Sequence, residues 1–362
     1  MYKFLLLVAC LATTAIGCTQ QNADNEFITA DDSRIGYIGR VSHTRKNVAR
    51  YTYPGTTIVA NFSSTSIAMK TKPESGFYMV EIDDNEAFKV NTQTADSLIV
   101  LADSLDDGMH SIKIMYVVEG YELKPEFYGF VLDAGATLGA KPTLPERKIE
   151  FIGNSITCGY GVEGTADEGF AYDTENHYFT YAAIATRTLR AQHFAIARSG
   201  IGIYRNYGAP REGSPDCMPA MYHQTLFTDT TETWDSSLYT PAVVCVNLGT
   251  NDTSLDNYDT EKLTSAYADF VARLRSIYAD AQIVMLTGSM LNGKALDDVR
   301  NALNTVVDKA RKNGDERISR FDFTPQDGSL GYGSDWHPSK AQQQKMADEL
   351  VPYLREITGW TD

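Results

Sequence analysis

Cysteine is scarce in this chain, which has five in 362 residues. Cys10 and Cys18 fall in an N-terminal leader region, which leaves Cys158, Cys217 and Cys245. Three cysteines without a C-x-x-C pair exclude a disulfide framework, allow at most one bridge and give no zinc pattern. We therefore expect no metal and no cofactor, and we expect Cys158 and Cys245 to be buried in or beside apolar runs.

The chain also lacks an excess of positive charge. It carries 32 Lys and Arg against 47 Asp and Glu, so its formal net charge is −15 and its pI is near 4.9. Binding of nucleic acid is excluded, because neutralising phosphates requires patches of Lys and Arg. No run of like charge stands out, and we interpret the acidic excess as a solubilising surface.

Long hydrophobic runs are missing except near the start. The run FLLLVACLATTAI follows Lys3 and is too short to span a bilayer, which predicts a signal peptide over residues 1–17. The segment AIGC resembles a bacterial lipobox with Cys18 as the lipidated residue, although Ala15 stands where Leu is usual. We expect an exported lipoprotein, membrane-anchored in the periplasm or at the cell surface, with residues 18–33 as a polar tether. Plain secretion is the alternative.

Residues 34–140 alternate in the manner of short strands. Runs such as TTIVANF, GFYMVEID and HSIKIMYVVEG are separated by turn residues, for example at Asp106-Asp107-Gly108. Short strands with such turns and no helical pattern predict an antiparallel sandwich of the jelly-roll type. The segment GAKPTLPERK, residues 139–148, is predicted to link this domain to the next.

Residues 146–362 alternate between strands and helices. Apolar strands are predicted at residues 149–153, 193–199, 242–249, 282–288 and 317–323, and amphipathic helices at 264–281, 296–312 and 339–357. This alternation predicts an α/β domain with a doubly wound, five-stranded parallel sheet.

Polar residues follow four of the five predicted strands. Ligands of open parallel sheets bind beyond the carboxyl ends of the strands, so these residues are predicted to share one site. They are Asn154 and Ser155, then Ser199 and Gly200, then Asn251 and Asp252, and finally Asp335 and His337.

This set of residues fits acyl transfer. A serine hydroxyl becomes a nucleophile when a base takes its proton, and histidine titrates in the right range, so Ser155 and His337 are the predicted catalytic pair. The tetrahedral oxyanion needs preorganised donors, which the amides of Ser155 and Gly200 and the side chain of Asn251 would supply. A structural alternative for Ser155 is a simple helix N-cap.

Four segments resemble the sequence blocks of the SGNH/GDSL hydrolases in the right order. They are FIGNSIT, ARSGIGIY, NLGTNDTS and DWHPS, with Asn154 where the family more often has Asp. The preceding jelly-roll domain resembles the layout of carbohydrate esterase family 2. The resemblance implies a serine esterase that removes acetyl groups from cell-wall polysaccharides such as xylan or glucomannan through an acetyl-enzyme.

The acidic member of the expected triad departs from that pattern. The superfamily places it three residues before the histidine, where this chain has Ser334, while Asp335 lies two before. Asp335 is retained as the predicted third catalytic residue. A backbone carbonyl that orients His337, leaving a Ser–His dyad, is the alternative.

A G-x-G-x-x-G pattern at Gly159, Gly161 and Gly164 suggests a competing nucleotide site. A dinucleotide fingerprint follows its strand directly and opens the helix, whereas five residues intervene here. Acidic side chains in the loop, Glu163 and Glu168 among them, would repel a pyrophosphate. We therefore expect no nucleotide partner.

Residues 201–241 show no regular rhythm and carry several aromatic side chains. Aromatic faces stack on sugars, so Tyr204 and Trp336 are the predicted substrate contacts, with Asp252 as a weaker one. His177 and His223 lie in irregular regions and stay open as contacts. Two rival functions also stay open: hydrolysis of another acyl substrate, such as a lipid or thioester, and polysaccharide binding by a lipoprotein with secondary esterase activity.

Overall fold

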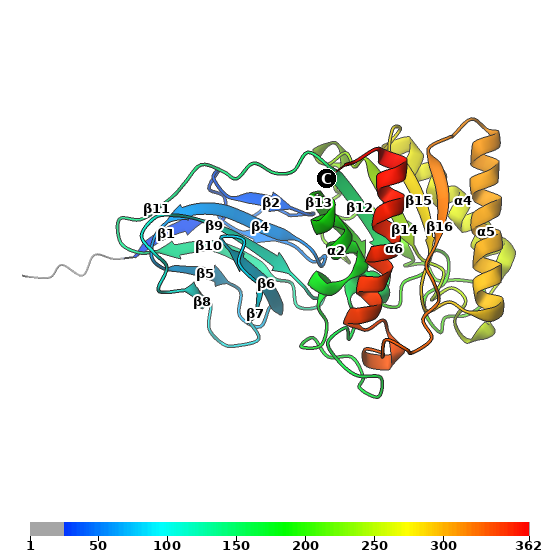
Figure 1. Ribbon diagram of the computed structural model, residues 1–362, viewed down its shortest axis with the longest axis horizontal. Helices are drawn as coiled ribbons and strands as arrows, with labels where there is room; N and C mark the ends of the chain where they lie inside the picture. Colours follow the sequence, from blue (N-terminus) through cyan, green and yellow to red (C-terminus); the bar gives the residue numbers. More distant parts are fainter. Residues whose placement is uncertain (1–24, 362) are drawn as a thin grey trace, which may run out of the picture.

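The computed structural model describes residues 25–361. These residues form an all-β domain and an α/β domain that pack side by side (Figure 1). The predicted signal peptide and the lipidated Cys18 lie outside the described residues and stay predictions. Among the helices described, none has the length and apolarity needed to cross a bilayer.

The first domain is a sandwich of two antiparallel sheets, as predicted. One sheet has the order β1-β10-β5-β8, with β3 also paired to β10. Its strands are β1 (Glu26–Thr29), β10 (Glu126–Leu132), β5 (Ile67–Thr71), β8 (Leu98–Ala102) and β3 (Ala49–Arg50). The other has the order β11-β4-β9-β6-β7, with β2 paired to β4. Its strands are β11 (Thr137–Leu138), β4 (Thr57–Ser63), β9 (Met109–Tyr116), β6 (Phe77–Ile82), β7 (Phe88–Asn91) and β2 (Gly36–Ile38).

The tether predicted at residues 18–33 is shorter than expected. Residues Glu26–Thr29 form strand β1, which pairs antiparallel with β10 from Glu26 opposite Leu132 to Thr29 opposite Gly129. The exposed edge of β10 supplies the hydrogen-bonding groups that an extended segment needs, and Ile28 packs against the sandwich core. The polar composition of this segment therefore led to a predicted domain boundary that left out one edge strand of the sandwich.

The second domain contains the predicted parallel sheet. Its strand order is β13-β12-β14-β15-β16, and every pair is parallel. The strands are β12 (Lys148–Gly153), β13 (Gln192–Ala197), β14 (Val243–Asn247), β15 (Gln282–Thr287) and β16 (Ile318–Asp322). The chain leaves β12 toward β13 on one side and later returns to β14 on the other. The carboxyl end of β12 is therefore the topological switch point, where ligands bind in such sheets.

Helices cover both faces of this sheet. The helices are α1 (Ser155–Cys158), α2 (Tyr181–Thr188), α3 (Met218–Met221), α4 (Thr260–Ile277), α5 (Gly293–Lys312) and α6 (Lys340–Thr358). Short 3₁₀ turns are η1 (His177–Phe179), η2 (Ser236–Leu238), η3 (Ser254–Asp256) and η4 (Ser334–Trp336). Helices α4 and α5 contribute to one apolar core, and α2 and α6 contribute to another on the opposite face.

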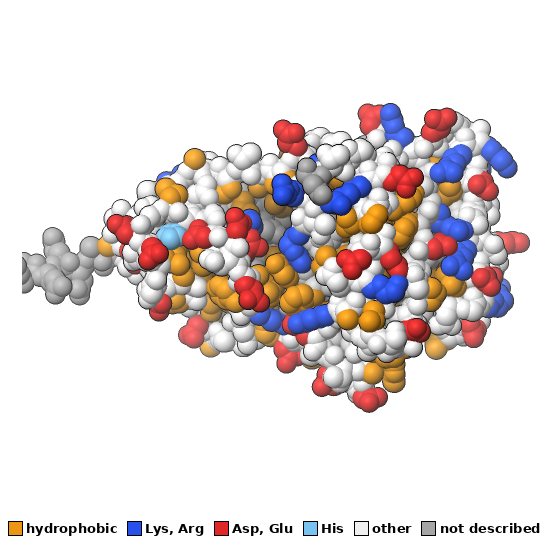
Figure 2. Space-filling view, in the orientation of Figure 1, with side chains coloured by type: hydrophobic (Ala, Val, Ile, Leu, Met, Phe, Trp, Pro, Cys, Tyr) orange, Lys and Arg blue, Asp and Glu red, His pale blue; other side chains and the backbone are white. Residues whose placement is uncertain are grey.

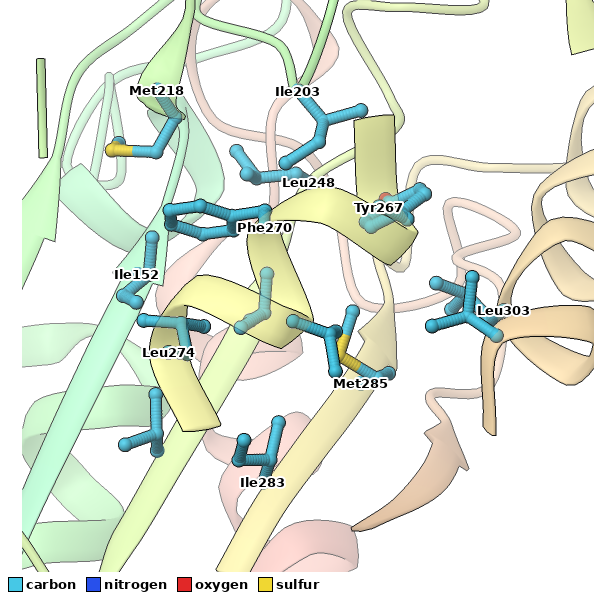
Figure 3. Close-up of a cluster of buried hydrophobic side chains, with 14 of the residues drawn as sticks. Ile152, Ile203, Met218, Leu248, Tyr267, Phe270, Leu274, Ile283, Met285 and Leu303 are labelled. Carbon is cyan, nitrogen blue, oxygen red and sulfur yellow. The ribbon is translucent and has the colours of Figure 1, made fainter. Parts of the chain in front are cut away.

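The core under α4 shows how the helical period produces this packing. Phe270 and Leu274 lie one turn apart on α4 and face Ile152, Ile283 and Met285 of the sheet (Figure 3). Asp259 caps the start of α4, because its carboxylate accepts hydrogen bonds from the first free amides. Burying one such apolar side chain contributes about 1.5–3 kcal/mol to stability, which anchors the strand ends that carry the site.

The two domains share a buried interface. Tyr53 of the sandwich belongs to the apolar core of the α/β domain, and its hydroxyl donates to the carbonyl of Gln224 at 3.2 Å. The fully buried Arg40 donates to the same carbonyl at 2.9 Å and lies over the ring of Tyr222. Strand β13, the sheet edge next to the sandwich, is buried along its whole length. The sandwich therefore covers an edge that would otherwise be open to pairing.

The visible surface is polar and mixed in charge. Figure 2 shows acidic and basic side chains interspersed over both domains, and a hollow where the sandwich meets α2. This hollow has a volume of about 440 Å³ and is lined by residues such as Val59, Met115 and Arg187. None of the predicted site residues lines it.

Candidate active site

Ser155 is the first residue of α1, directly beyond strand β12. The preceding residue, Asn154, is the N-cap, because its side-chain oxygen accepts a hydrogen bond from the Ile156 amide at 3.1 Å. The structural alternative for Ser155 is therefore wrong: its hydroxyl does not cap the helix. It is 7% exposed and lies at the switch point of the sheet.

His337 lies far from Ser155 in the sequence but contacts it in the fold. Its Nε2 lies 2.8 Å from the Ser155 Oγ, although the two residues are 182 positions apart. His337 follows η4 and precedes α6, whose N-cap is Ser339. The Tyr160 ring stacks on the imidazole with 4.2 Å between centroids, which restricts rotation of the imidazole.

The Nδ1 atom of His337 is held by a backbone carbonyl. It lies 3.0 Å from the Ser334 oxygen, whereas the Asp335 carboxylate accepts the Tyr160 hydroxyl at 2.5 Å. The interpretation of Asp335 as the triad acid is therefore wrong. The physical reason is the turn: Asp335 and Trp336 both have positive φ, 47° and 57°, and in this turn the carbonyl of Ser334 meets the ring.

Burial lowers the pKa of His337 below its ordinary value of 6.5. The carbonyl of Ser334 and the nearby Asp335 charge oppose this shift, but desolvation is the largest cause. The imidazole is therefore neutral near pH 7 and able to accept a proton from the hydroxyl beside it.

This pKa predicts the acid limb of the pH profile. Any reaction that uses neutral His337 as its base should keep a nearly constant kcat/KM at neutral pH. The rate should begin to fall only below pH 6.5, then by about tenfold per pH unit, because only the unprotonated fraction reacts. Initial rates with an aryl acetate between pH 4 and 8 measure it. An acid limb with its midpoint above pH 7 would contradict the lowered pKa of this partly buried histidine.

Three groups that follow the adjacent parallel strands β12, β13 and β14 are the predicted oxyanion donors. The amides of Ser155 and Gly200 donate to no protein acceptor in the described part of the chain. Asn251 is buried, and one N–H of its side chain donates to the Ile201 carbonyl at 2.8 Å, which leaves the other N–H free. Such an arrangement is suited to a developing oxyanion.

Gly200 has a conformational reason to be glycine. Its φ is +76°, in the left-handed region, while a Cβ there would meet no atom within 4 Å. Backbone strain, not crowding, is therefore the cost of a side chain at this position.

Asp252 does not face the site. It is fully buried, and its carboxylate accepts the amides of Ile203, Tyr204 and Arg205 at 2.8–3.0 Å. The predicted substrate contact is therefore wrong, because those amides take the carboxylate oxygens. Asp252 instead folds the loop that begins at Gly200.

The two predicted aromatic contacts, Trp336 and Tyr204, differ in their exposure. Trp336 is 55% exposed beside His337 and stays a predicted substrate contact. Tyr204 is half-buried, and its hydroxyl accepts the Asp259 amide at 2.7 Å, so its role as a sugar contact gains no support. Tyr207, an aromatic residue of the same irregular segment that was not among the preferred contacts, is more exposed, and its amide donates to the Gly200 carbonyl at 2.9 Å. Sequence reasoning missed Tyr160, whose ring stacks on His337. For Tyr207 the only signal was its place in the irregular segment.

His177, left open as a contact, is buried away from solvent. Its Nε2 lies 2.6 Å from the Nε2 of His193, and burial lowers the pKa of His177 to about 4 and that of His193 well below its usual value. Two neutral imidazoles, one donating to the other, account for this pair. The interpretation of His177 as a substrate contact is wrong.

The glycine pattern packs against the histidine turn. A Cβ on Gly161 or Gly164 would come within 2.2 Å of Ser334 side-chain atoms, and the Ser334 amide donates to the Gly161 carbonyl at 2.9 Å. The glycines therefore permit the close approach that places the Ser334 carbonyl under His337. Their role is steric.

Among residues 25–361, one buried group has residue types that could hold a metal ion. The ligand atoms of Glu119, Cys158 and Glu175 lie within 4.8 Å of one another. Burial raises the pKa of all three groups, so a metal would have to displace protons to bind them. In the same part of the chain, Cys158, Cys217 and Cys245 are free and buried.

Comparison with known families and proteins agrees with this architecture. Residues 37–142 match the profile of the carbohydrate esterase 2 N-terminal domain, and residues 149–350 match that of the GDSL-like lipase/acylhydrolases. The cellulase/esterase CelE of Acetivibrio thermocellus is 37% identical over 342 residues, which are 93% of this chain. This chain spans only 41% of the length of that relative.

Two further relatives are similar over their whole length. An acetylxylan esterase/glucomannan deacetylase of Cellvibrio japonicus is 27% identical over 365 residues, which cover 99% of each chain. The structure of a family two carbohydrate esterase from Clostridium thermocellum, in complex with cellohexaose, is 37% identical with a TM-score of 0.84. The match covers 90% of this chain and 100% of that one.

Proposed function

Because the chain belongs to the GDSL-like hydrolases and, with its matching sandwich domain, to carbohydrate esterase family 2, we propose that it hydrolyses O-acetyl esters on cell-wall polysaccharides. Xylan and glucomannan are the proposed substrates, in line with the names of the Cellvibrio japonicus relatives. The observation that carries the proposal is the 2.8 Å contact between Ser155 Oγ and His337 Nε2.

In the proposed acylation step, neutral His337 takes the proton of Ser155 as the Oγ attacks the acetyl carbonyl. The amides of Ser155 and Gly200 and the side chain of Asn251 stabilise the oxyanion of the tetrahedral intermediate. The Ser334 carbonyl holds the Nδ1 proton and so keeps Nε2 free to act as the base. When the intermediate collapses, the sugar oxygen leaves with the proton from Nε2.

Deacylation repeats these roles with water. His337 removes a proton from the water molecule, which attacks the acetyl group on Ser155, and acetate leaves as the hydroxyl regains its proton. The products are one acetate and one free sugar hydroxyl. The protein supplies the base, the nucleophile and the oxyanion donors from its own residues.

The exposed aromatic side chains support a sugar acceptor. Trp336 is 55% exposed and Tyr207 is 64% exposed, and each is linked to the machinery, Trp336 through the neighbouring His337 and Tyr207 through Gly200. Flat aromatic faces stack on sugar rings, whereas a lipid site would need a deeper apolar pocket.

A substrate panel tests the function and the role of Trp336. We expect the protein to release acetate from acetylated xylan and glucomannan and to leave long-chain acyl esters almost untouched. Trp336→Ala should raise KM for acetylated oligosaccharides about tenfold, equivalent to about 1.4 kcal/mol, because a stacking surface is lost. Its kcat/KM for a small aryl acetate should change less than about twofold.

Tyr353→Ala provides the control, because Tyr353 is an aromatic residue on α6 that packs against the other core. Preferential release of long acyl chains would contradict the polysaccharide proposal and favour the lipid alternative. Equal effects of Trp336→Ala on both substrate types would exclude a sugar-stacking role.

A second candidate function is glycan binding at the same site, with hydrolysis secondary. The cellohexaose complex of the 37% identical relative favours it. Affinity electrophoresis of the Ser155→Ala protein in gels with β-glucan or xylan separates binding from turnover. Retardation by β-glucan together with slow acetate release by the wild type would favour this candidate. As for the location of the protein, we propose export and a lipid anchor at Cys18, in line with the N-terminal sequence. Such an anchor would hold either activity at a membrane.

A further inference from the structure

A loop of the sandwich enters the α/β domain next to the site. It follows strand β9, and its residue Glu119 is 3% exposed. The Val117 carbonyl accepts the His177 amide at 2.8 Å, and the Glu119 amide donates to the Glu175 carboxyl group at 3.0 Å. The loop is therefore fixed to the segment at 175–177 on both sides of Val118.

The side chain of Glu119 continues to the Gly200 turn. Its Oε1 accepts the amide of Ser199 at 2.6 Å. Ser199 directly precedes Gly200, whose free amide is one of the oxyanion donors and whose φ of +76° defines the turn. An ionised acceptor at this short distance gives a stronger hydrogen bond than a neutral one.

Glu119 also lies against the segment that carries the nucleophile. The Cys158 thiol, at the end of α1, is within 4.8 Å of the Glu119 and Glu175 carboxyl oxygens. Ser155 begins the same short helix. One sandwich side chain thus lies between the two chain segments that present backbone donors to the oxyanion.

The charges in this group favour a shared proton. Burial, and next the charge of Glu119, raise the pKa of Glu175 well above its usual value, and burial raises that of Glu119. The Oε1 of Glu175 is buried and has no hydrogen-bond partner as a carboxylate oxygen. A proton on Glu175 leaves Glu119 ionised, with its oxygen free to accept the Ser199 amide. Two adjacent carboxylates in this buried place would repel each other.

We propose that Glu119 is a positioning residue of the oxyanion hole: by holding the Ser199 amide, it sets the direction of the Gly200 amide. The active site of the α/β domain is then complete only with the sandwich in place. The inference rests on the proposed esterase chemistry and adds a role for the first domain in it.

The test compares Glu119→Leu, Glu119→Ala and Glu119→Gln in the full chain with an aryl acetate as substrate. Losing one oxyanion donor costs about 10²–10³ in kcat, and a displaced donor should cost about 10- to 100-fold. We expect Leu and Ala to lower kcat by that factor with KM within about threefold. Gln retains an oxygen that can accept the Ser199 amide, so Glu119→Gln should keep kcat within about threefold of the wild type.

Val118→Ala is the matched control for loss of packing in the same loop, because Val118 is fully buried in the sandwich core. It should lower the melting temperature while kcat stays within about twofold. If Glu119→Ala and Glu119→Leu do not fold, the comparison of Glu119→Gln with Val118→Ala still decides, since a Gln variant with a large loss of kcat overturns the hydrogen-bond assignment.

Three results would overturn the inference. The first is wild-type kcat in folded Glu119→Ala or Glu119→Leu protein. The second is a loss of kcat in Val118→Ala as large as that in the Glu119 variants, for the same decrease in melting temperature. The third is an equivalent of tightly bound divalent metal in the purified protein that Glu119→Gln and Cys158→Ser abolish. Failure of the proposed esterase chemistry is distinct, because the wild-type protein itself would then be inactive on the aryl acetate, and failure of the polysaccharide proposal would appear only in the substrate panel.

Discussion

Replacing Ser155 by alanine should lower kcat for an aryl acetate by about 10⁴- to 10⁶-fold. Removal of the nucleophile from a serine hydrolase leaves only the residual effect of the oxyanion donors and of substrate binding. The backbone amides of Ser155 and Gly200 are unchanged by the substitution, so the small rate enhancement that they provide should persist. Initial-rate measurements, with the protein concentration raised for the variant, determine the loss.

The folded state should tolerate this change. Ser155 is 7% exposed, and its hydroxyl contacts His337 without capping α1, so the free energy of unfolding should change by about 1 kcal/mol or less. Ser289→Ala is the matched control, because Ser289 is buried near the carboxyl end of β15 and its hydroxyl has no hydrogen-bond partner. It should keep kcat within about threefold. Retention of more than one-tenth of wild-type turnover by Ser155→Ala would refute the assignment of the nucleophile.

Replacing His337 by alanine should cost about 10³- to 10⁵-fold in kcat, because the Ser155 hydroxyl would lose the base that is 2.8 Å away. Replacing Asp335 by alanine should cost less than about tenfold. Its carboxylate accepts the Tyr160 hydroxyl, while the Ser334 carbonyl remains to orient the ring. Both variants are measured with the same aryl acetate, and circular dichroism checks that each is folded.

The ratio of the kcat values of His337→Ala and Asp335→Ala tests the interpretation of the site as a Ser–His dyad. Loss of the acid of a Ser–His–Asp triad costs about 10⁴ in kcat. If Asp335→Ala approached that loss, the carboxylate would act on His337 in the reacting enzyme and the carbonyl would not be its main partner. Tyr160→Phe adds a control: it keeps the ring that stacks on His337 and removes the hydroxyl that binds Asp335. Its effect should be as small as that of Asp335→Ala.

The fold was predictable because its signals are local. Alternation in the sandwich strands and the helical spacing of Phe270 and Leu274 each depend on a few neighbouring residues, and the five predicted parallel strands overlap those observed. The place of the site was also predictable, because carboxyl ends of parallel strands meet at one edge. Ser155 and His337 needed only that rule and their chemistry.

Two of the wrong predictions concern the direction of side chains. Asp252 follows a strand as Ser155 does, yet its carboxylate turns to the amides of its own neighbouring loop. Asp335 is next to the active histidine turn, but a pair of positive φ values gives the contact with His337 to the Ser334 carbonyl. Neither outcome has a signature in residue type or spacing.

The sequence by itself therefore determined the two domain types, the alternation of strands and helices in the second domain and the residues proposed as nucleophile and base, since each follows from periodicity or from the chemistry of a side chain. Only the tertiary structure decided which atom holds the Nδ1 of His337, and that Glu119 of the sandwich reaches the Gly200 turn of the other domain. Those contacts depend on backbone dihedral angles and on the packing of the two domains. Both are determined by many residues that are distant in the sequence, so no local sequence pattern indicates them.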